Sequence, residues 1–109
     1  MLGGGDLVKK YTSEDVFEVI ETVMNDIRRS ILKHLSKVKK MKFSDILGAL
    51  EEEFGSDRVK SNTLAYHLKI MLEVGLLKNE RVRRESYYSL SERGEKLLRA
   101  IERLEKSLL

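Results

Sequence analysis

The chain has 109 residues, enough for one compact domain, and 36% of them are charged: 21 Lys and Arg against 18 Asp and Glu, a net charge of +3. It contains no cysteine, which excludes a disulfide framework, a thiolate nucleophile and a cysteine-based metal site. No apolar run approaches the ~18 residues that cross a bilayer, so we expect a soluble, cytoplasmic protein.

The chain is predicted to consist of a short leader and one domain. Residues 1–10 are expected to be a flexible N-terminal leader, and they lack the apolar core of a signal peptide. Residues 11–109 are expected to form the domain, which begins with a helix over residues 11–25 and ends with a helix over residues 91–109.

Apolar residues at helical spacing mark the first part of the domain. Thr12 is typical of a helix N-terminus, and Asn25 is typical of a second one. The pattern leaves open whether residues 13–37 form one bent helix or two. The apolar positions are Val16, Ile20, Val23, Ile27, Ile31, Leu32 and Leu35, and Phe17 and Met24 widen the stripe.

Two further helices are predicted in the middle of the chain, after a brief strand at residues 39–43. Ser44 is expected to cap the first of them, which Gly55 ends, and Ser61 the second, which Gly75 ends. Their predicted buried residues are Ile46, Leu47, Leu50 and Phe54 in the first helix and Leu64, Leu68, Met71 and Leu72 in the second.

A hairpin and a last helix complete the predicted order. Two short strands, Leu76–Arg83 and Ser86–Leu90, enclose a charged turn, and Ser91 is expected to cap the last helix. Two short helices joined by a turn and followed by a hairpin define a winged helix-turn-helix. The predicted fold class is therefore mainly α with a small β-hairpin wing.

The charges are segregated along the chain. Residues 11–27 carry five acidic and no basic residues, and residues 28–42 carry seven basic and no acidic ones. Residues 43–57 again carry five acidic and no basic residues, whereas residues 58–88 carry seven basic and three acidic ones. A charge run alone more often indicates a solvated surface with internal salt bridges. Here both positive segments coincide with elements that a winged helix would place against DNA phosphates.

The segment Ser61–Leu77 closely resembles the recognition helix of ArsR-like winged-helix transcription regulators. The residues that match the family pattern are Thr63, Leu64, His67, Leu68, Gly75, Leu76 and Leu77, whereas Ala65 stands where the family often has Ser. Asn25–Leu35 resembles the first core helix of that family, and Arg84–Leu90 resembles its wing. The lack of cysteine and glutamine together with abundant charge is typical of heat-adapted proteins, so we expect a thermophilic, archaeal-type member.

The outward face of residues 61–74 is expected to enter the major groove, with its N-terminal residues against base edges. The wing, residues 78–88, is expected on the backbone or in the minor groove. The resemblance implies a DNA-side contact for His67, whose alternative is a place at the rim of the core. The expected DNA contacts are Ser61, Asn62, Thr63, Tyr66, His67, Lys69, Arg81, Arg83, Arg84, Lys42 and Lys60.

The two terminal helices are predicted to form a homodimer. Leu97, Ile101, Leu104 and Leu108 recur at the spacing of a short coiled coil, although packing against their own domain is the alternative. The first helix contributes Val16, Phe17 and Ile20. A two-fold axis between two chains would set the recognition helices about 34 Å apart, which implies a palindromic site.

The sequence therefore predicts a homodimeric regulator that binds specific double-stranded DNA and has no catalytic activity. The alternative is a winged-helix module that binds a protein or coats DNA without sequence preference. With no cysteine and only His34 and His67, we expect no metal and no cofactor. The sequence leaves the effector, the target site and the sign of regulation open.

Overall fold

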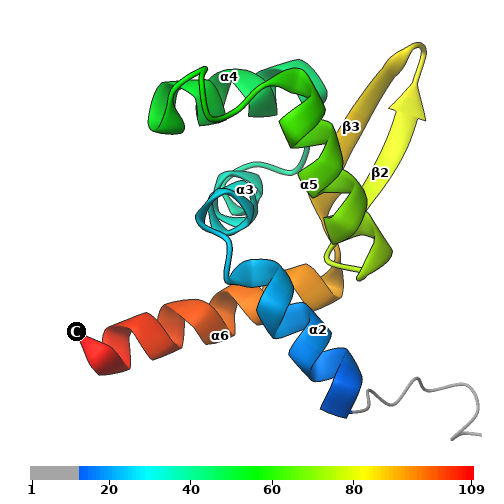
Figure 1. The fold of residues 1–109 in the computed structure, drawn as a ribbon. Coiled ribbons are helices and arrows are strands. Elements are labelled where there is room, and N and C mark those ends of the chain that lie inside the picture. The colour runs from blue at the N-terminus through cyan, green and yellow to red at the C-terminus, as the bar shows by residue number, and fades with distance from the viewer. Residues whose placement is uncertain (1–12) are drawn as a thin grey trace, which may run out of the picture.

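The structure is a computed structural model that describes residues 13–109. These residues form five helices and a three-stranded antiparallel sheet (Figure 1). The expected leader, residues 1–10, lies outside the described residues. The elements are, in chain order, α2 (Ser13–Val23), α3 (Asp26–Ser36), β1 (Met41–Lys42), α4 (Phe43–Phe54), α5 (Ser61–Glu73), β2 (Leu77–Val82), β3 (Glu85–Leu90) and α6 (Glu92–Leu108).

Residues 13–36 form two helices, and the break between α2 and α3 falls at Met24 and Asn25. The backbone of Asn25 is extended, and its side-chain oxygen accepts a hydrogen bond of 3.1 Å from the backbone amide of Arg28. This bond satisfies one of the amides that the start of a helix leaves without a partner. The predicted second N-terminus at Asn25 is confirmed, and the question of one helix or two is settled in favour of two.

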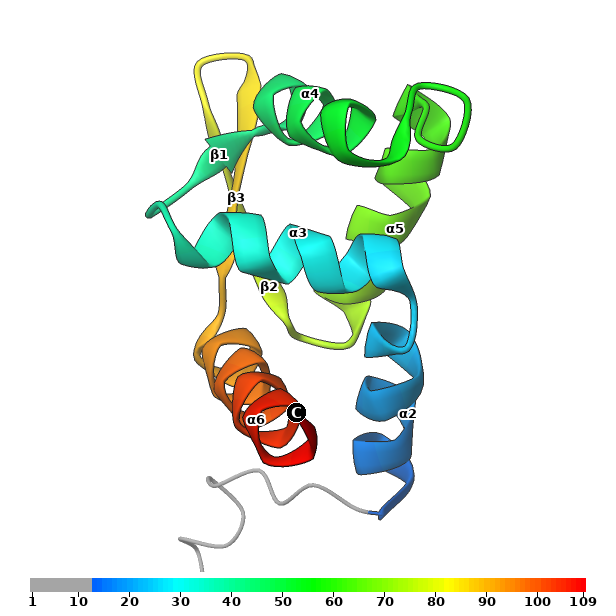
Figure 2. The ribbon, with the colours of Figure 1, turned by 90° about the vertical axis from the view of Figure 1, so that its left-hand side faces the viewer.

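Helix α3 lies in the middle of the molecule, with α4 on one side and α2 and α6 on the other (Figure 2). Its apolar face joins one continuous core with side chains from α4, α5 and the strands. Burial of each large apolar side chain contributes about 1.5–3 kcal/mol, so this core fixes α4 and α5 against α3. The core residues without solvent exposure include Ile31, Leu32, Ile46, Leu50, Val59, Leu64, Met71 and Leu76.

Only one side of the apolar stripe of α2 packs against the core of its own chain. The side chains of α2 that face the core are Val19, Thr22 and Val23, whereas Val16 and Ile20 are exposed. The reason is that α2 touches the rest of the described chain along one narrow side, while its apolar stripe is wider than that contact. In the two central helices, the expected core residues Leu47, Phe54 and Leu72 are only partly buried.

The sheet has the strand order β1-β3-β2, with all pairs antiparallel. Strands β2 and β3 pair up to Val82 and Glu85, which leaves Arg83 and Arg84 as a two-residue turn. Arg83 has a φ of 57°, a left-handed conformation that favours glycine. The predicted hairpin is confirmed, and the predicted brief strand is the two-residue β1 on the outer side of β3.

Three of the predicted helix starts can be compared with the observed caps. Helices α4 and α5 begin one or two residues earlier than expected, with Lys42 and Lys60 at the N-cap and no side-chain cap bond at either. The predictions of Ser44 and Ser61 as caps are therefore wrong. Ser91 is confirmed as the cap of α6, because its hydroxyl accepts a hydrogen bond of 3.0 Å from the amide of Gly94.

The close approach of α6 to the start of β2 makes Gly94 indispensable. A Cβ on Gly94 would overlap the carbonyl oxygen of Leu76, whereas a Cβ on Gly48 of α4 would meet no atom within 4 Å. We expect Gly94→Ala to lower the free energy of unfolding by about 1–3 kcal/mol. Gly48→Ala, the matched control on a helix surface, should raise it by about 0.5–1 kcal/mol. Urea titrations of both variants measure this, and equal stabilities for the two would contradict the packing described here.

Candidate nucleic-acid interface

Helix α5 presents a polar stripe on the side opposite its buried residues. Leu64 and Met71 are fully buried and hold the inner face of the helix on the core. Asn62, Tyr66 and Lys69 follow one another at intervals of four and three residues, so they share the opposite face, and all three are exposed. Tyr66 has 59% of its surface in solvent. This stripe is accessible to a partner from residue 62 to residue 69 of the helix.

The first turn of α5 adds short polar side chains to the stripe. Lys60 and Ser61 are exposed, and Thr63 is partly buried. The side-chain oxygen of Asn62 accepts a hydrogen bond of 2.9 Å from the amide of Thr63. This bond orients the Asn62 side chain, while its amino group and a second oxygen lone pair stay available for a partner.

The wing brings further cations to the same side of the molecule. Its strand β2 packs against α5, and the tip of the hairpin lies at the same end of the molecule as α4 (Figures 1 and 2). Arg81, Arg83 and Arg84 are exposed, two of them in the turn itself. The left-handed backbone of Arg83 is a strained choice for a side chain with a Cβ, and strain of this kind occurs most often at functional positions.

Most of the predicted DNA-binding cations have no carboxylate partner. We call five of them the interface cations: Lys60, Lys69, Arg81, Arg83 and Arg84. Within residues 13–109, none of these five takes part in an ion pair. By contrast, Lys40 pairs with Glu80 at 3.0 Å beside the hairpin. The interface cations therefore keep their full charge for an anionic partner.

Lys42 differs from the interface cations. Its amino group lies 3.3 Å from a carboxylate oxygen of Glu85, across the strand pair of β1 and β3. The hydrogen bond to Glu85 raises the pKa of Lys42 above its ordinary value. Lys42 is thus placed at the edge of the sheet with a partner of its own, and a DNA contact would compete with that pair.

The first positive segment of the sequence, residues 28–42, does not form one surface. Arg29 donates a hydrogen bond of 2.7 Å to the carbonyl of Val23, and Lys33 pairs with Glu105 of α6. These cations point toward α2 and α6, on the side of α3 away from α4. The expectation that the whole segment faces DNA is wrong, because a count along the chain does not distinguish the sides of a helix.

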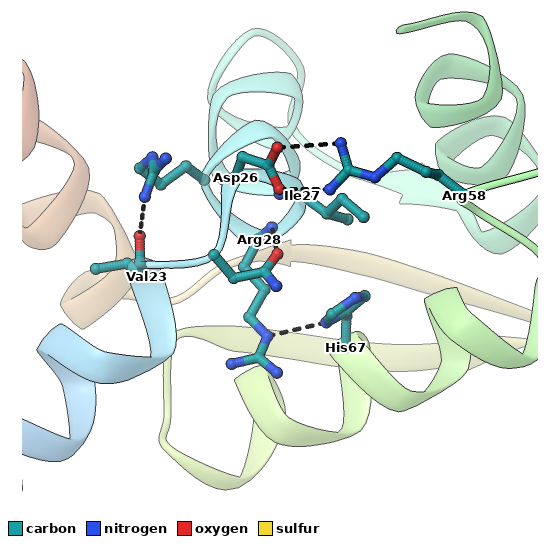
Figure 3. Close-up of polar contacts among 8 residues, drawn as sticks. Val23, Asp26, Ile27, Arg28, Arg58 and His67 are labelled. Carbon is teal, nitrogen blue, oxygen red and sulfur yellow. Dashed lines mark hydrogen bonds and ion pairs between the residues drawn. The ribbon is translucent and has the colours of Figure 1, made fainter. Parts of the chain in front are cut away.

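Arg28 connects three helices, and Figure 3 shows its bond to His67. From its place on α3 it donates from Nε to Nδ1 of His67 on α5 at 2.9 Å and from Nη1 to the carbonyl of Thr22 on α2 at 3.3 Å. Its guanidinium carbon lies 6.0 Å from the centre of the Tyr66 ring. His67 itself is only 6% exposed. The structure thus places His67 at the rim of the core, and the DNA contact expected for it stays a prediction.

Asp26 and Arg58 form a second polar link at the start of α3. Two nitrogens of Arg58, in the connection between α4 and α5, donate to the two oxygens of Asp26 at 2.9 and 3.2 Å (Figure 3). The Arg58 hydrogen bonds hold the pKa of Asp26 below its ordinary value. Both side chains are about half exposed, so the pair positions the connection more than it stabilises the fold.

The environment of His67 favours its neutral form. Burial is the main cause that lowers the pKa of His67 below its ordinary value of 6.5, and the positive charge of Arg28 lowers it further. The carboxylate of Asp26 acts in the opposite direction. A guanidinium nitrogen only donates hydrogen bonds, so Nδ1 must be the acceptor and the ring proton must sit on Nε2.

The sequence alone does not reveal that Arg28, Asp26 and Arg58 hold α5 and the α4–α5 connection in place. A weak signal for His67 was present, because it lies on the same side of α5 as the buried Leu64 and Met71. For Arg28 and Arg58 no local signal exists, since their partners lie 39 and 32 residues away in the chain.

The described residues offer no group of three or more His, Asp or Glu side chains that would hold a metal ion. None of the helices in this part of the chain is both long and apolar enough to cross a membrane.

No model of a known protein family matches the chain, and no curated protein sequence matches it. Solved structures match along nearly the whole chain. The DNA-binding domain of Mb0332 from Mycobacterium bovis, a homodimeric winged helix-turn-helix, has a TM-score of 0.73 at 17% identity and covers 94% of either chain. HlyU from Vibrio cholerae has a TM-score of 0.71 at 18% identity, with 88% of this chain and 97% of that one covered.

A transcriptional regulator homologue from Pyrococcus horikoshii has a TM-score of 0.70 at 20% identity and covers 87% of this chain and 93% of its own. An ArsR-family transcriptional regulator is also among the matches, with a TM-score of 0.64. At these identities the likeness establishes the fold. The chain has the winged helix-turn-helix fold, and the predicted structural resemblance to ArsR-like regulators is confirmed.

The buried neutral ring of His67 makes stability depend on pH. Below about pH 6.5 the unfolded chain takes up a proton on His67 that the folded chain, with its lowered pKa, takes up only at lower pH. The free energy of unfolding should therefore fall as the pH decreases from about 7 to 5. The variant His67→Asn has no side-chain group that titrates in this range, so its free energy of unfolding should fall less than that of the unsubstituted chain. Urea titrations along this pH range measure the slopes, and equal slopes for His67→Asn and the unsubstituted chain would contradict the assignment.

Proposed function

We propose that the chain is a transcription regulator of the ArsR-like type that binds specific double-stranded DNA as a homodimer and acts without catalysis. The observation that carries this proposal is the exposed polar stripe of α5 beside the interface cations. A helix with short polar side chains in its first turn, next to cations without partners, fits a DNA major groove and its phosphates. The homodimeric DNA-binding domain of Mb0332, which shares the fold, supports the same function.

The first turn of α5 would contact the bases. Asn62 presents an amino donor and an oxygen acceptor, the pair of groups that binds the major-groove edge of adenine. Ser61 and Thr63 flank it and suit a phosphate or a thymine methyl group. Tyr66 and Lys69 lie further along the stripe and suit the phosphates at the wall of the groove.

The wing would bind the backbone or the minor groove. Arg83 and Arg84 occupy the tip of the hairpin, where a two-residue turn projects both side chains into solvent. Arginine is the residue type that most often enters a narrow minor groove. Arg81 and Lys60 would add phosphate contacts on either side of the recognition helix.

The apolar faces of α2 and α6 would form the dimer interface. Both helices lie at the end of the molecule away from α4 (Figures 1 and 2). Phe17 and Leu104 are 64% and 59% exposed, a large apolar surface for a chain that is otherwise rich in charge. Val16, Ile20 and Leu108 are also exposed, whereas Leu97 and Ile101 also pack against their own core.

Removal of two interface cations at the wing tip should weaken DNA binding of every sequence. We expect Arg83→Ala combined with Arg84→Ala to reduce the slope of log affinity against log salt by about 4, because the homodimer loses two cations from each chain and each cation neutralises one phosphate. The matched control, Arg103→Ala with Lys106→Ala, removes the same charge from exposed positions on α6. Fluorescence anisotropy with random and selected duplexes measures both slopes. An unchanged slope in the wing variant would exclude the wing from the interface.

Loss of the Asn62 amide should affect specificity instead. We expect Asn62→Ala to cost about 1–3 kcal/mol of discrimination at one base pair and to change binding of random duplex little. Competition between duplexes that differ at single positions measures this. A specificity ratio near one for the unsubstituted chain would instead favour the alternative, a winged helix that coats DNA or binds a protein.

A further inference from the structure

One arginine joins the recognition helix to the helix proposed for dimerisation. Arg28 reaches α5 through Nδ1 of His67 (Figure 3) and reaches α2 through the carbonyl of Thr22, at the last turn of that helix. The carbonyls at a helix end have no partner inside the helix, so a guanidinium that binds one of them fixes that end. The bond from Arg29 to the carbonyl of Val23 and the apolar contacts of Val19 and Val23 also hold α2.

The link depends on the protonation state of His67. The hydrogen bond exists only while Nδ1 carries a lone pair, as in the neutral ring with its proton on Nε2. A proton added to Nδ1 would direct its N–H at the N–H of Arg28 and would bring a second positive charge to a site that is almost closed to solvent. The two donors then repel each other, and one of the two side chains must move.

We propose that Arg28 is a positioning residue that couples the setting of α5 to α2, and that protonation of His67 breaks this coupling and weakens DNA binding. The inference rests on the proposed function, because it concerns the distance between the α5 helices of the two chains when the homodimer binds one DNA site. Tyr66, beside His67 in sequence, would transmit the change directly, since Arg28 also lies over its ring and Tyr66 belongs to the exposed stripe.

The charged groups around the imidazole come from α3. Arg28 faces Nδ1, and the carboxylate of Asp26 acts on the ring from further away while it pairs with Arg58 of the α4–α5 connection. Helix α2 contributes the neutral carbonyl of Thr22, and α5 itself contributes the neutral phenol ring of Tyr66. Among these groups only His67 changes charge between about pH 5 and pH 8.

The sign of the effect distinguishes this coupling from ordinary electrostatics. Protonation of His67 adds positive charge, which by itself would strengthen binding to a polyanion. The proposed coupling has the opposite result: affinity falls as the pH decreases. We expect a loss on the order of tenfold between pH 7.5 and 5.5, within the range common for coupled sites.

The experiment uses the full chain and a duplex selected from a random-sequence pool at pH 7.5. Anisotropy titrations at both pH values and constant ionic strength compare the unsubstituted chain with His67→Asn, Arg28→Met and the control His34→Gln. The unsubstituted chain and the control should lose affinity at pH 5.5. His67→Asn should keep its affinity, and Arg28→Met should bind more weakly at pH 7.5 and show no further loss. Circular dichroism at both pH values checks that each protein is folded.

The outcomes separate this inference from the proposed function. If the unsubstituted chain binds DNA equally or more tightly at pH 5.5, the coupling is overturned and the proposed function still stands. This comparison does not depend on the folding of any variant. An equal loss in His67→Asn overturns it as well. Failure of the pool to yield any preferred duplex overturns the proposed function and, with it, the inference. A carbon-edited NMR titration of the two histidines in the free chain provides a check without DNA: a midpoint for His67 that is not raised in Arg28→Met would contradict the link.

Discussion

The packing of α3 is the contact on which the rest of the structure depends. Its Ile31 and Leu32 are fully buried among side chains from the neighbouring elements, so both helices of the helix-turn-helix rest on it. Its first turn adds polar links in three directions: Arg29 to the end of α2, Asp26 to the α4–α5 connection, and Arg28 to α5. Helix α5, which would enter the DNA groove, is therefore held in position by α3, which lies outside the proposed DNA interface.

This arrangement divides the cations into two kinds. Cations on α3 and near the sheet, such as Arg28 and Lys40, have partners inside the chain and serve to hold elements together. The interface cations, on and just before α5 and on the wing, have no ion-pair partner within residues 13–109, and strand β2 of the wing packs against α5. Since Arg103 and Lys106 of α6 also have no ion pair among the described residues, it is position on α5 and the wing that distinguishes the interface cations, and the net charge of +3 does not show it.

The sequence predicted the order of elements well, because helical spacing and caps such as Asn25 and Ser91 are local signals. It was wrong where the answer depends on distant residues. The segment 28–42 was expected to face DNA, but its arginines bind carbonyls of α2, which no local pattern reveals. For His67 the sequence left two places open, a DNA contact and the rim of the core; packing sets its burial, and its contact with DNA stays a prediction. The stripe of Asn62, Tyr66 and Lys69 was predictable, since it follows from the buried residues on the other side of the same helix.

The central claim is that this winged helix binds specific DNA as a dimer, and selection of bound duplexes from a random-sequence pool tests it most directly. The account predicts enrichment of a palindromic site whose half-sites lie about one helical turn, or 34 Å, apart. A pool that shows no enriched sequence after repeated rounds, with equal affinity for its members and for random duplex, would contradict it.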